Sequence, residues 1–167
     1  MTRGDDTTRG EESGGRGHVD GFDLTRFFPY RLAVLAERVS LAVSQLYADR
    51  FDLTRAEWRV LAALGANRTM SAKDIGPYST LDKMQVSRAV ARLEERGLVR
   101  REEDASDRRA KILSLTPAGR AMHQKIVPLV RAREDYLLGE MTPEERTLFE
   151  RAMASVLARA DGLIERG

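Results

Sequence analysis

The segment from Leu81 to Gly119 constrains the fold of this chain more than any other. Its first part, LDKMQVSRAVARLEERG, places Val86, Val90 and Leu93 on one face of a helix that Gly97 closes. Its second part, LVRREEDASDRRAKILSLTPAGR, contains two short apolar strands joined by a polar, basic tip. A helix followed directly by a basic β-hairpin is typical of a winged helix-turn-helix domain. The segment therefore predicts a mainly α fold with a small β-hairpin wing.

Helical patterns occupy most of the chain on either side of this segment. Two capping boxes, Thr54–Glu57 and Thr142–Glu145, each predict the start of a helix, as do Thr116 and the Pro117 that follows it. The predicted strands are Leu98–Val99 and Ile112–Leu115. The predicted helices are Leu32 to about Arg50, Thr54 to a stop at Gly65, Ala72 to about Tyr78 after a cap at Ser71, Asp82–Arg96, Pro117–Leu137, and Thr142–Ile164.

Residue types that several functional classes need are missing. The chain has no Cys, which excludes disulfides, thiolate metal sites and cysteine redox switches. Two isolated histidines, His18 and His123, do not form a metal-ligand cluster. No nucleophile with a plausible base and no Gly-rich phosphate loop is present, so we expect no enzyme and no cofactor. Without a membrane-length apolar run or a signal-peptide core, we expect a cytoplasmic protein that does not bind a membrane.

The outward face of the Asp82–Arg96 helix favours DNA recognition. Arg88 and Gln85 could make bidentate contacts with guanine and adenine, each worth ~1–3 kcal/mol of discrimination. Ser87 and Lys83 suit phosphate contacts, which position a protein without specifying sequence. An ordinary surface helix has a similar composition, and the net charge of +2 discriminates little. The predicted DNA-binding residues from this part of the chain are Ser71, Lys83, Met84, Gln85, Ser87, Arg88 and Arg92.

The hairpin tip strengthens the DNA-binding hypothesis. Arg108 and Arg109 are adjacent there, and arginines suit the enhanced negative potential of a narrow minor groove. Asp107 has the wrong charge for a DNA surface, but a carboxylate can hold a neighbouring guanidinium in a fixed orientation. We therefore predict that Asp107, Arg108 and Arg109 form the DNA-binding part of the wing.

These motifs resemble the MarR family of winged-helix transcription regulators. The helix residues Val86–Val90 and the exit Leu93–Val99 resemble its recognition helix, and Trp58–Leu61 resembles its second helix. The resemblance extends from about Leu32 to Ile164. The family's wing signature, Asp-x-Arg followed after five residues by Leu-Thr-x-x-Gly, is met by Asp107, Arg109, Leu115, Thr116 and Gly119.

The resemblance implies a homodimer on a pseudo-palindromic double-stranded DNA site, with half-sites about one helical turn apart. The first helix and the last two helices would form the dimerisation layer. Residues 1–21 contain too few apolar side chains to offset their ordering entropy, so we expect a disordered tail there. The expected domains are then residues 1–21 as the tail, 22–50 as the N-terminal dimerisation helix, 51–116 as the winged helix-turn-helix, and 117–167 as the C-terminal dimerisation helices.

The resemblance also implies a repressor that a small ligand releases, often a phenolic or other aromatic acid. Aromatic walls and a guanidinium suit an aromatic carboxylate or a CoA thioester. Trp58 and Leu61 fit an ordinary core better than a ligand cleft, and Arg31, Arg38 and His123 also fit a solvated surface. The absence of Cys excludes the family's peroxide-sensing branch, and the two histidines argue against its zinc-sensing branch. The candidate ligand-binding residues are Tyr30, Arg31, Leu35, Arg38, Trp58, Leu61 and His123.

Two alternatives remain open from the sequence. The first is a DNA-binding regulator or activator that responds to no ligand, because a ligand cleft and an interhelical core use the same residue types. The second is a winged-helix protein that contacts only other proteins, although the outward Arg88, Arg108 and Arg109 argue against it.

Overall fold

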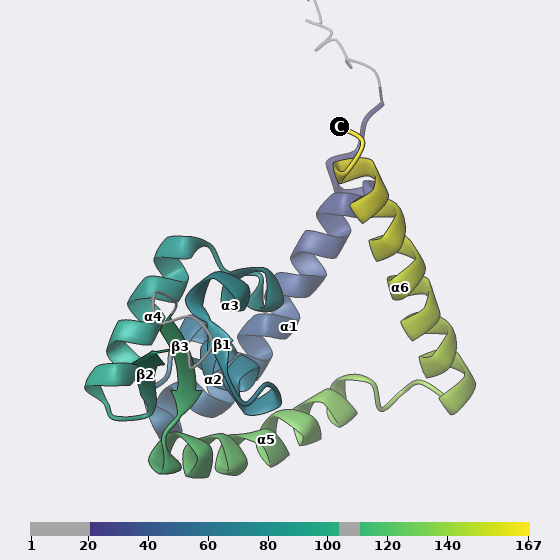
Figure 1. The fold of residues 1–167 in the computed structure, drawn as a ribbon. Helices are drawn as coiled ribbons and strands as arrows, with labels where there is room; N and C mark the ends of the chain where they lie inside the picture. Colours follow the sequence, from purple (N-terminus) through teal and green to yellow (C-terminus); the bar gives the residue numbers. More distant parts are fainter. Residues whose placement is uncertain (1–20, 104–110) are drawn as a thin grey trace, which may run out of the picture. The chain divides into compact units, whose positions relative to one another are not determined.

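The computed structural model describes residues 21–103 and 111–167 (Figure 1). By internal packing the chain divides into two units, Met1–Glu37 and Arg38–Gly167, and the boundary falls inside helix α1, Phe28–Phe51. Residues 1–20 of the predicted N-terminal tail and the predicted wing tip with Asp107, Arg108 and Arg109 lie outside the described residues.

The described part of the first unit is a helical entry to α1. A short 3₁₀ turn, η1 (Leu24–Arg26), is capped by Asp23, whose Oδ1 accepts a hydrogen bond from the Thr25 amide at 2.9 Å. The α1 helix then begins at Phe28, earlier than the predicted Leu32, so Pro29 lies in its first turn. A proline is tolerated there because a first-turn amide has no partner within the helix.

The second unit contains the winged helix-turn-helix. Three helices, α2 (Arg55–Ala66), α3 (Ala72–Ser79) and α4 (Lys83–Glu95), lie beside a small sheet of β1 (Met70–Ser71), β2 (Val99–Glu103) and β3 (Lys111–Leu115) (Figure 1). The strand order is β1-β3-β2 and both pairings are antiparallel. The mainly α fold with a hairpin wing is therefore confirmed.

The register of the sheet divides the hairpin into two faces. Val99 pairs with Leu115 and Arg101 with Leu113, which places these residues on the side of the core. Arg100 pairs with Ser114 on the opposite side, because successive side chains of a strand point to opposite faces. The strand β1 was not predicted, since two residues carry no alternation pattern.

The core of the second unit is apolar and continuous across helices and sheet. Each of α2, α3 and α4 buries its inward stripe, and the inner strand residues close one side. Burying such side chains contributes ~1.5–3 kcal/mol each before entropic costs. The fully or nearly fully buried members include Tyr47, Leu53, Val60, Leu61, Leu64, Ile75, Val86, Val90, Leu93, Leu113, Leu115 and Ile126.

The helix caps follow the predicted pattern with one correction. The capping boxes at Thr54–Glu57 and Thr142–Glu145 are both present, and Thr116 caps α5 (Pro117–Leu137). The prediction that Gly65 stops the second helix is wrong, because α2 continues to Ala66 and Asn67 caps it. Gly65 instead makes room for a neighbour, since a Cβ there would overlap the imidazole of His123.

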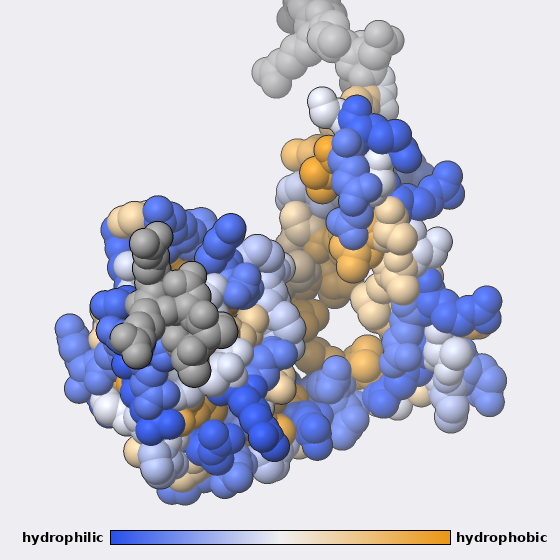
Figure 2. Space-filling model, in the orientation of Figure 1, coloured by the Kyte–Doolittle hydropathy of each residue, from blue (hydrophilic) through white to orange (hydrophobic). Residues whose placement is uncertain are grey.

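The last helix, α6 (Pro143–Ile164), buries none of its residues. Apolar side chains lie at the surface along it (Figure 2), with Leu157 62% exposed and Ile164 78% exposed. An amphipathic helix gains most of its stability by packing its apolar face. No helix among the described residues has the length and apolar character that crossing a lipid bilayer requires.

Candidate nucleic-acid interface

The helix α4 is held at its start by a reciprocal cap. Asp82 Oδ1 accepts a hydrogen bond from the Gln85 amide at 2.7 Å, and Gln85 Oε1 accepts one from the Asp82 amide at 3.0 Å. This box satisfies two amides that have no partner within the helix. The side-chain oxygen Oε1 of Gln85 is therefore engaged in the cap, and the side-chain NH₂ group is the part left to contact a base.

The two faces of α4 separate core from surface. Val86, Val90 and Leu93 are buried, as the helical periodicity predicted, and Ala89 is buried with them. The opposite face is open to solvent, and the part of the second unit around it is mostly hydrophilic on the side shown in Figure 2. A helix with one buried stripe and one open polar face can enter a major groove without unpacking its domain. The predicted DNA-binding residues that lie exposed on α4 are Lys83, Met84, Gln85, Ser87, Arg88 and Arg92.

Arg92 has a structural partner that the sequence analysis missed. Its Nε lies 3.1 Å from Oε1 of Glu57, whose side chain is 1% exposed, whereas the Arg92 side chain is 54% exposed. The other carboxylate oxygen of Glu57 accepts the Thr54 amide at 2.7 Å in the α2 capping box. Arg92 therefore joins α4 to α2, and its Nη1 and Nη2 are the atoms left for the predicted DNA contact.

Ser71 lies at the N-cap of α3. Its hydroxyl oxygen accepts the Asp74 amide at 3.2 Å, and the hydroxyl donates to Asp74 Oδ2 at 2.6 Å. The hydroxyl is thus occupied by the cap, so its predicted contact with DNA would require the cap to be shared or broken.

The base of the wing is fixed by Thr116 and Gly119. Thr116 Oγ1 donates to the Gly97 carbonyl at 2.7 Å, and the Thr116 amide donates to the Leu98 carbonyl at 3.1 Å. A Cβ on Gly119 would overlap the same Leu98 carbonyl. These contacts give the Thr-x-x-Gly part of the wing signature a physical role: the start of α5 packs directly on the exit of α4.

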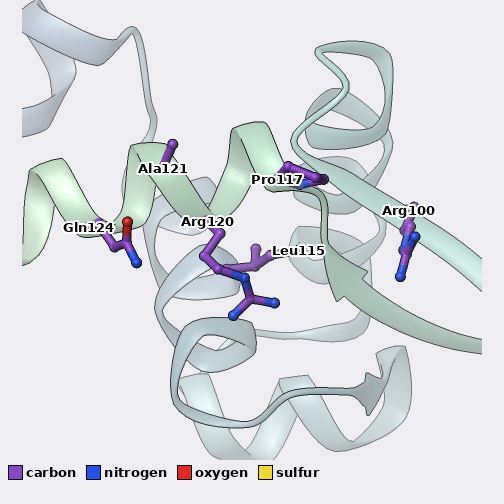
Figure 3. Close-up of a pocket in the computed structure, with 6 residues that line it drawn as sticks. All are labelled: Arg100, Leu115, Pro117, Arg120, Ala121 and Gln124. Atoms are coloured by element: carbon purple, nitrogen blue, oxygen red, sulfur yellow. The ribbon is translucent and has the colours of Figure 1, made fainter.

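Two adjoining hollows on the outer side of the sheet are basic, and none of the residues that line them was predicted to bind DNA or a ligand. One of about 350 Å³ is lined by Arg100 of β2 and by Arg120, which extends from the first turn of α5 (Figure 3). The other, of about 470 Å³, adds Arg68. Arg100 is partly neutralised by Glu102, whose Oε1 lies 3.3 Å from its Nε, and the same Nε donates to Ser114 Oγ at 3.0 Å. Arg68 precedes β1, Arg100 lies on β2 and Arg120 on α5, so these residues meet through tertiary packing and no local motif could have indicated them.

The candidate ligand-binding residues are distributed over both units. Tyr30, Arg31 and Leu35 lie exposed on α1 in the first unit. In the second unit, Arg38 is exposed on α1 and Leu61 is fully buried in the core.

Trp58 and His123 form an aromatic stack inside the second unit. Their ring centroids are 5.9 Å apart, and the ring centroid of Tyr47, which was not predicted, lies 5.5 Å from that of Trp58. Burial, with a smaller effect of the Arg120 charge, lowers the pKa of His123 below its ordinary value of 6.5. Burial likewise raises the pKa of Tyr47. Within the described residues no group of three His, Asp or Glu side chains is placed to hold a metal ion.

Comparison with known proteins places these features in one family. A family model described as MarR family matches residues 51–110. The transcriptional regulator HosA of Escherichia coli is 31% identical over 98 residues, which span 59% of this chain and 73% of HosA. A transcriptional regulator of the MarR family from Silicibacter pomeroyi has a similar structure, with a TM-score of 0.71 and 31% identity over 82% of this chain and 92% of that one.

A second solved structure is similar at lower identity. BpsR of Bordetella bronchiseptica, whose DNA binding is regulated by 6-hydroxynicotinic acid, has a TM-score of 0.72 and 26% identity over 81% of this chain and 96% of its own.

Proposed function

The chain belongs to the MarR family of transcriptional regulators, and from this membership we propose that it is a repressor that a small aromatic acid or aromatic acyl-CoA thioester releases from its operator. A regulator of this type binds DNA. Proteins of this family are generally not enzymes, and we propose that this chain also acts by binding alone.

The observation that supports the DNA contacts best is the open polar face of α4 above a completely buried one. We assign Arg88 to a guanine edge and Lys83 and Ser87 to phosphates on the flanks of the groove. Gln85 would contact an adenine with its NH₂ group, since its oxygen holds the cap. The wing residues Arg108 and Arg109, oriented by Asp107, would enter the adjacent minor groove.

Regulators of this family bind DNA as dimers, and the uncovered apolar side chains of α6 suit such an arrangement. We propose that a second copy of the chain covers them. Two copies related by a two-fold axis would place two recognition helices in successive major grooves, ~34–36 Å apart. The operator would then be a pseudo-palindrome.

The effector proposal has two supports. The half-buried rings of Trp58 and His123, with Tyr47 buried beside Trp58, provide aromatic surface in the second unit. The similar protein BpsR is regulated by 6-hydroxynicotinic acid, which is itself an aromatic carboxylic acid. A ligand that binds the free form better than the DNA-bound form shifts the equilibrium away from DNA.

The proposal is tested with an operator selected from random duplexes and a panel of hydroxylated benzoic, cinnamic and nicotinic acids and their CoA thioesters. At least one compound should lower operator affinity in fluorescence anisotropy and raise the melting temperature of the free protein. Cyclohexanecarboxylic acid, which has the carboxylate without the aromatic ring, is the matched control. Unchanged operator affinity across the whole panel would contradict release by an aromatic acid and favour a ligand-independent regulator.

A further inference from the structure

A single side chain joins the end of the recognition helix to the end of α1. Arg96 caps α4, and its Nη1 and Nη2 donate to the carbonyls of Asp52 and Phe51 at 2.6 and 2.8 Å. These carbonyls lie at the C-terminal end of α1. Carbonyls in the last turn of a helix have no partners within the helix, and the helix dipole favours a cation there. The residues are 44 and 45 positions apart in sequence, so the link is tertiary.

The backbone that receives Arg96 is held in an unusual conformation. Asp52 has φ of +50°, in the left-handed region that costs a residue with a Cβ about 1–2 kcal/mol. The next residue, Leu53, is buried in the core and fixes this turn in place. The turn allows two successive carbonyls to accept from one guanidinium fork, a geometry that the single ammonium of lysine cannot reproduce.

The same end of α4 also contacts the start of α5. Gly97, with φ of +66°, ends the helix, and its carbonyl and that of Leu98 accept the two hydrogen bonds from Thr116. Residues 96–98 therefore form one junction between the recognition helix and two helices of the proposed dimerisation layer.

A small rotation at this junction has a large effect at the DNA end of α4. Lys83 and Arg96 are separated by 13 residues, and at 1.5 Å per residue the helix extends ~20 Å between them. A pivot of about 10° at Arg96 would displace the Lys83 end by ~3.4 Å, which is about the rise of one base pair along a strand of DNA. A change of this size in the angle of α4 is therefore enough to distinguish operators whose half-site spacing differs by one base pair.

We infer that Arg96 is a positioning residue for operator binding, which sets the half-site spacing that the dimer accepts. It acts through α4 and not by touching DNA. The inference rests on the proposed binding of a dimer to two half-sites. Loss of Arg96 leaves the buried stripe of α4 and its contact with α5 intact, so the helix stays folded while its angle becomes less defined.

The test uses the full-length protein and a series of operators whose two half-sites are moved apart or together by one and two base pairs. Each added base pair shifts the half-sites by ~3.4 Å and rotates them by about 34°. The variants are Arg96→Met, which keeps an unbranched apolar stem and removes the guanidinium, and Arg96→Lys, which keeps the charge and can reach one carbonyl. Arg101→Met is the matched control, because it removes the same charge and breaks the exposed ion pair with Glu94 at 3.0 Å.

We expect wild-type affinity to fall roughly tenfold or more for one inserted base pair, and that of Arg96→Met by about threefold or less. Arg96→Lys should lie between them, and Arg101→Met should keep the wild-type preference. Circular dichroism checks that each variant is folded, and if Arg96→Met is not, Arg96→Lys carries the comparison.

If a folded Arg96 variant binds more weakly than the wild type by the same factor at every spacing, the inference is overturned and the proposed function stays intact. A wild-type protein without any spacing preference would overturn the two-half-site function, and this inference with it.

Discussion

Glu57 and Arg92 form an ion pair of 3.1 Å in which the carboxylate is completely buried and the guanidinium is half exposed. Among the described residues, no donor makes a hydrogen bond to Oε1 of Glu57, so the nearby positive charge of Arg92 is what compensates for the burial of this oxygen. The pair connects α2 to the middle of the recognition helix. The two partners differ in their need for the pair: Glu57 is buried and has Arg92 as its counter-ion, whereas water can solvate the half-exposed Arg92.

The Arg92→Met variant should therefore lose stability beyond what a surface charge explains. It leaves the buried carboxylate of Glu57 without its counter-ion, which costs about 1–3 kcal/mol or more. Urea unfolding at pH 7 measures the change. The control, Arg101→Met, breaks an exposed pair and should cost less than ~1 kcal/mol. Equal losses in the two variants would show that the Glu57 contact carries no special weight.

Gly119→Ala should destabilise the junction between the wing and α5. The new Cβ would overlap the Leu98 carbonyl, and backbone has little freedom to move, so we expect a loss of roughly 1–3 kcal/mol. Gly162→Ala in α6 is the contrast, because its Cβ meets only the flexible side chain of Arg166 at 3.5 Å. That substitution should stabilise the helix by about 0.4–1 kcal/mol. Thermal melts of both variants give the comparison, and a neutral Gly119→Ala would contradict the close packing.

Stability should fall as the pH is lowered from 7.5 towards 6, because of His123. Its pKa in the folded state lies below 6.5, so between the two values the unfolded chain binds more protons than the folded one. Folding is then weakened progressively as the pH drops through 6.5 to the folded pKa. Denaturant unfolding across this range should show the slope in the wild type and a smaller slope in His123→Gln. The same slope in both proteins would assign the effect to another group.

Arg88 and Lys83 should respond differently to substitution, because we assign one to a base and the other to phosphate. Arg88→Ala should cost about 1–3 kcal/mol on the selected operator and relax the preference at one base pair. Lys83→Ala should weaken binding to all duplexes alike and reduce the salt dependence by about one counterion. Anisotropy titrations on cognate and substituted duplexes at several salt concentrations separate the two. A uniform loss in both variants would contradict the base contact of Arg88.

The sequence predicted the elements whose determinants are local. The buried positions Val86, Val90 and Leu93 recur at helical spacing within one segment, and the Thr54–Glu57 box spans four consecutive residues. Both could therefore be predicted from the sequence. Gly65 was misassigned because the sequence does not distinguish a glycine that ends a helix from one that leaves room for a side chain far along the chain, here the imidazole of His123.

The contacts that organise the candidate interface were not predictable in the same way. Arg96 reaches carbonyls 44 and 45 residues away, and Arg92 a carboxylate on another helix, so their partners depend on how the helices pack. The binding roles of the DNA and ligand candidates remain predictions, because they depend on molecules other than this chain.

The uncovered apolar side chains of α6 would make the activity of the proposed regulator depend on its own concentration. If a second copy supplies the packing that α6 lacks, folding and association are one equilibrium, and the folded fraction rises with the concentration of the chain. A cell that halves its synthesis of such a regulator loses more than half of the operator-binding form. Response to dosage is then steeper than proportional, without any effector being present.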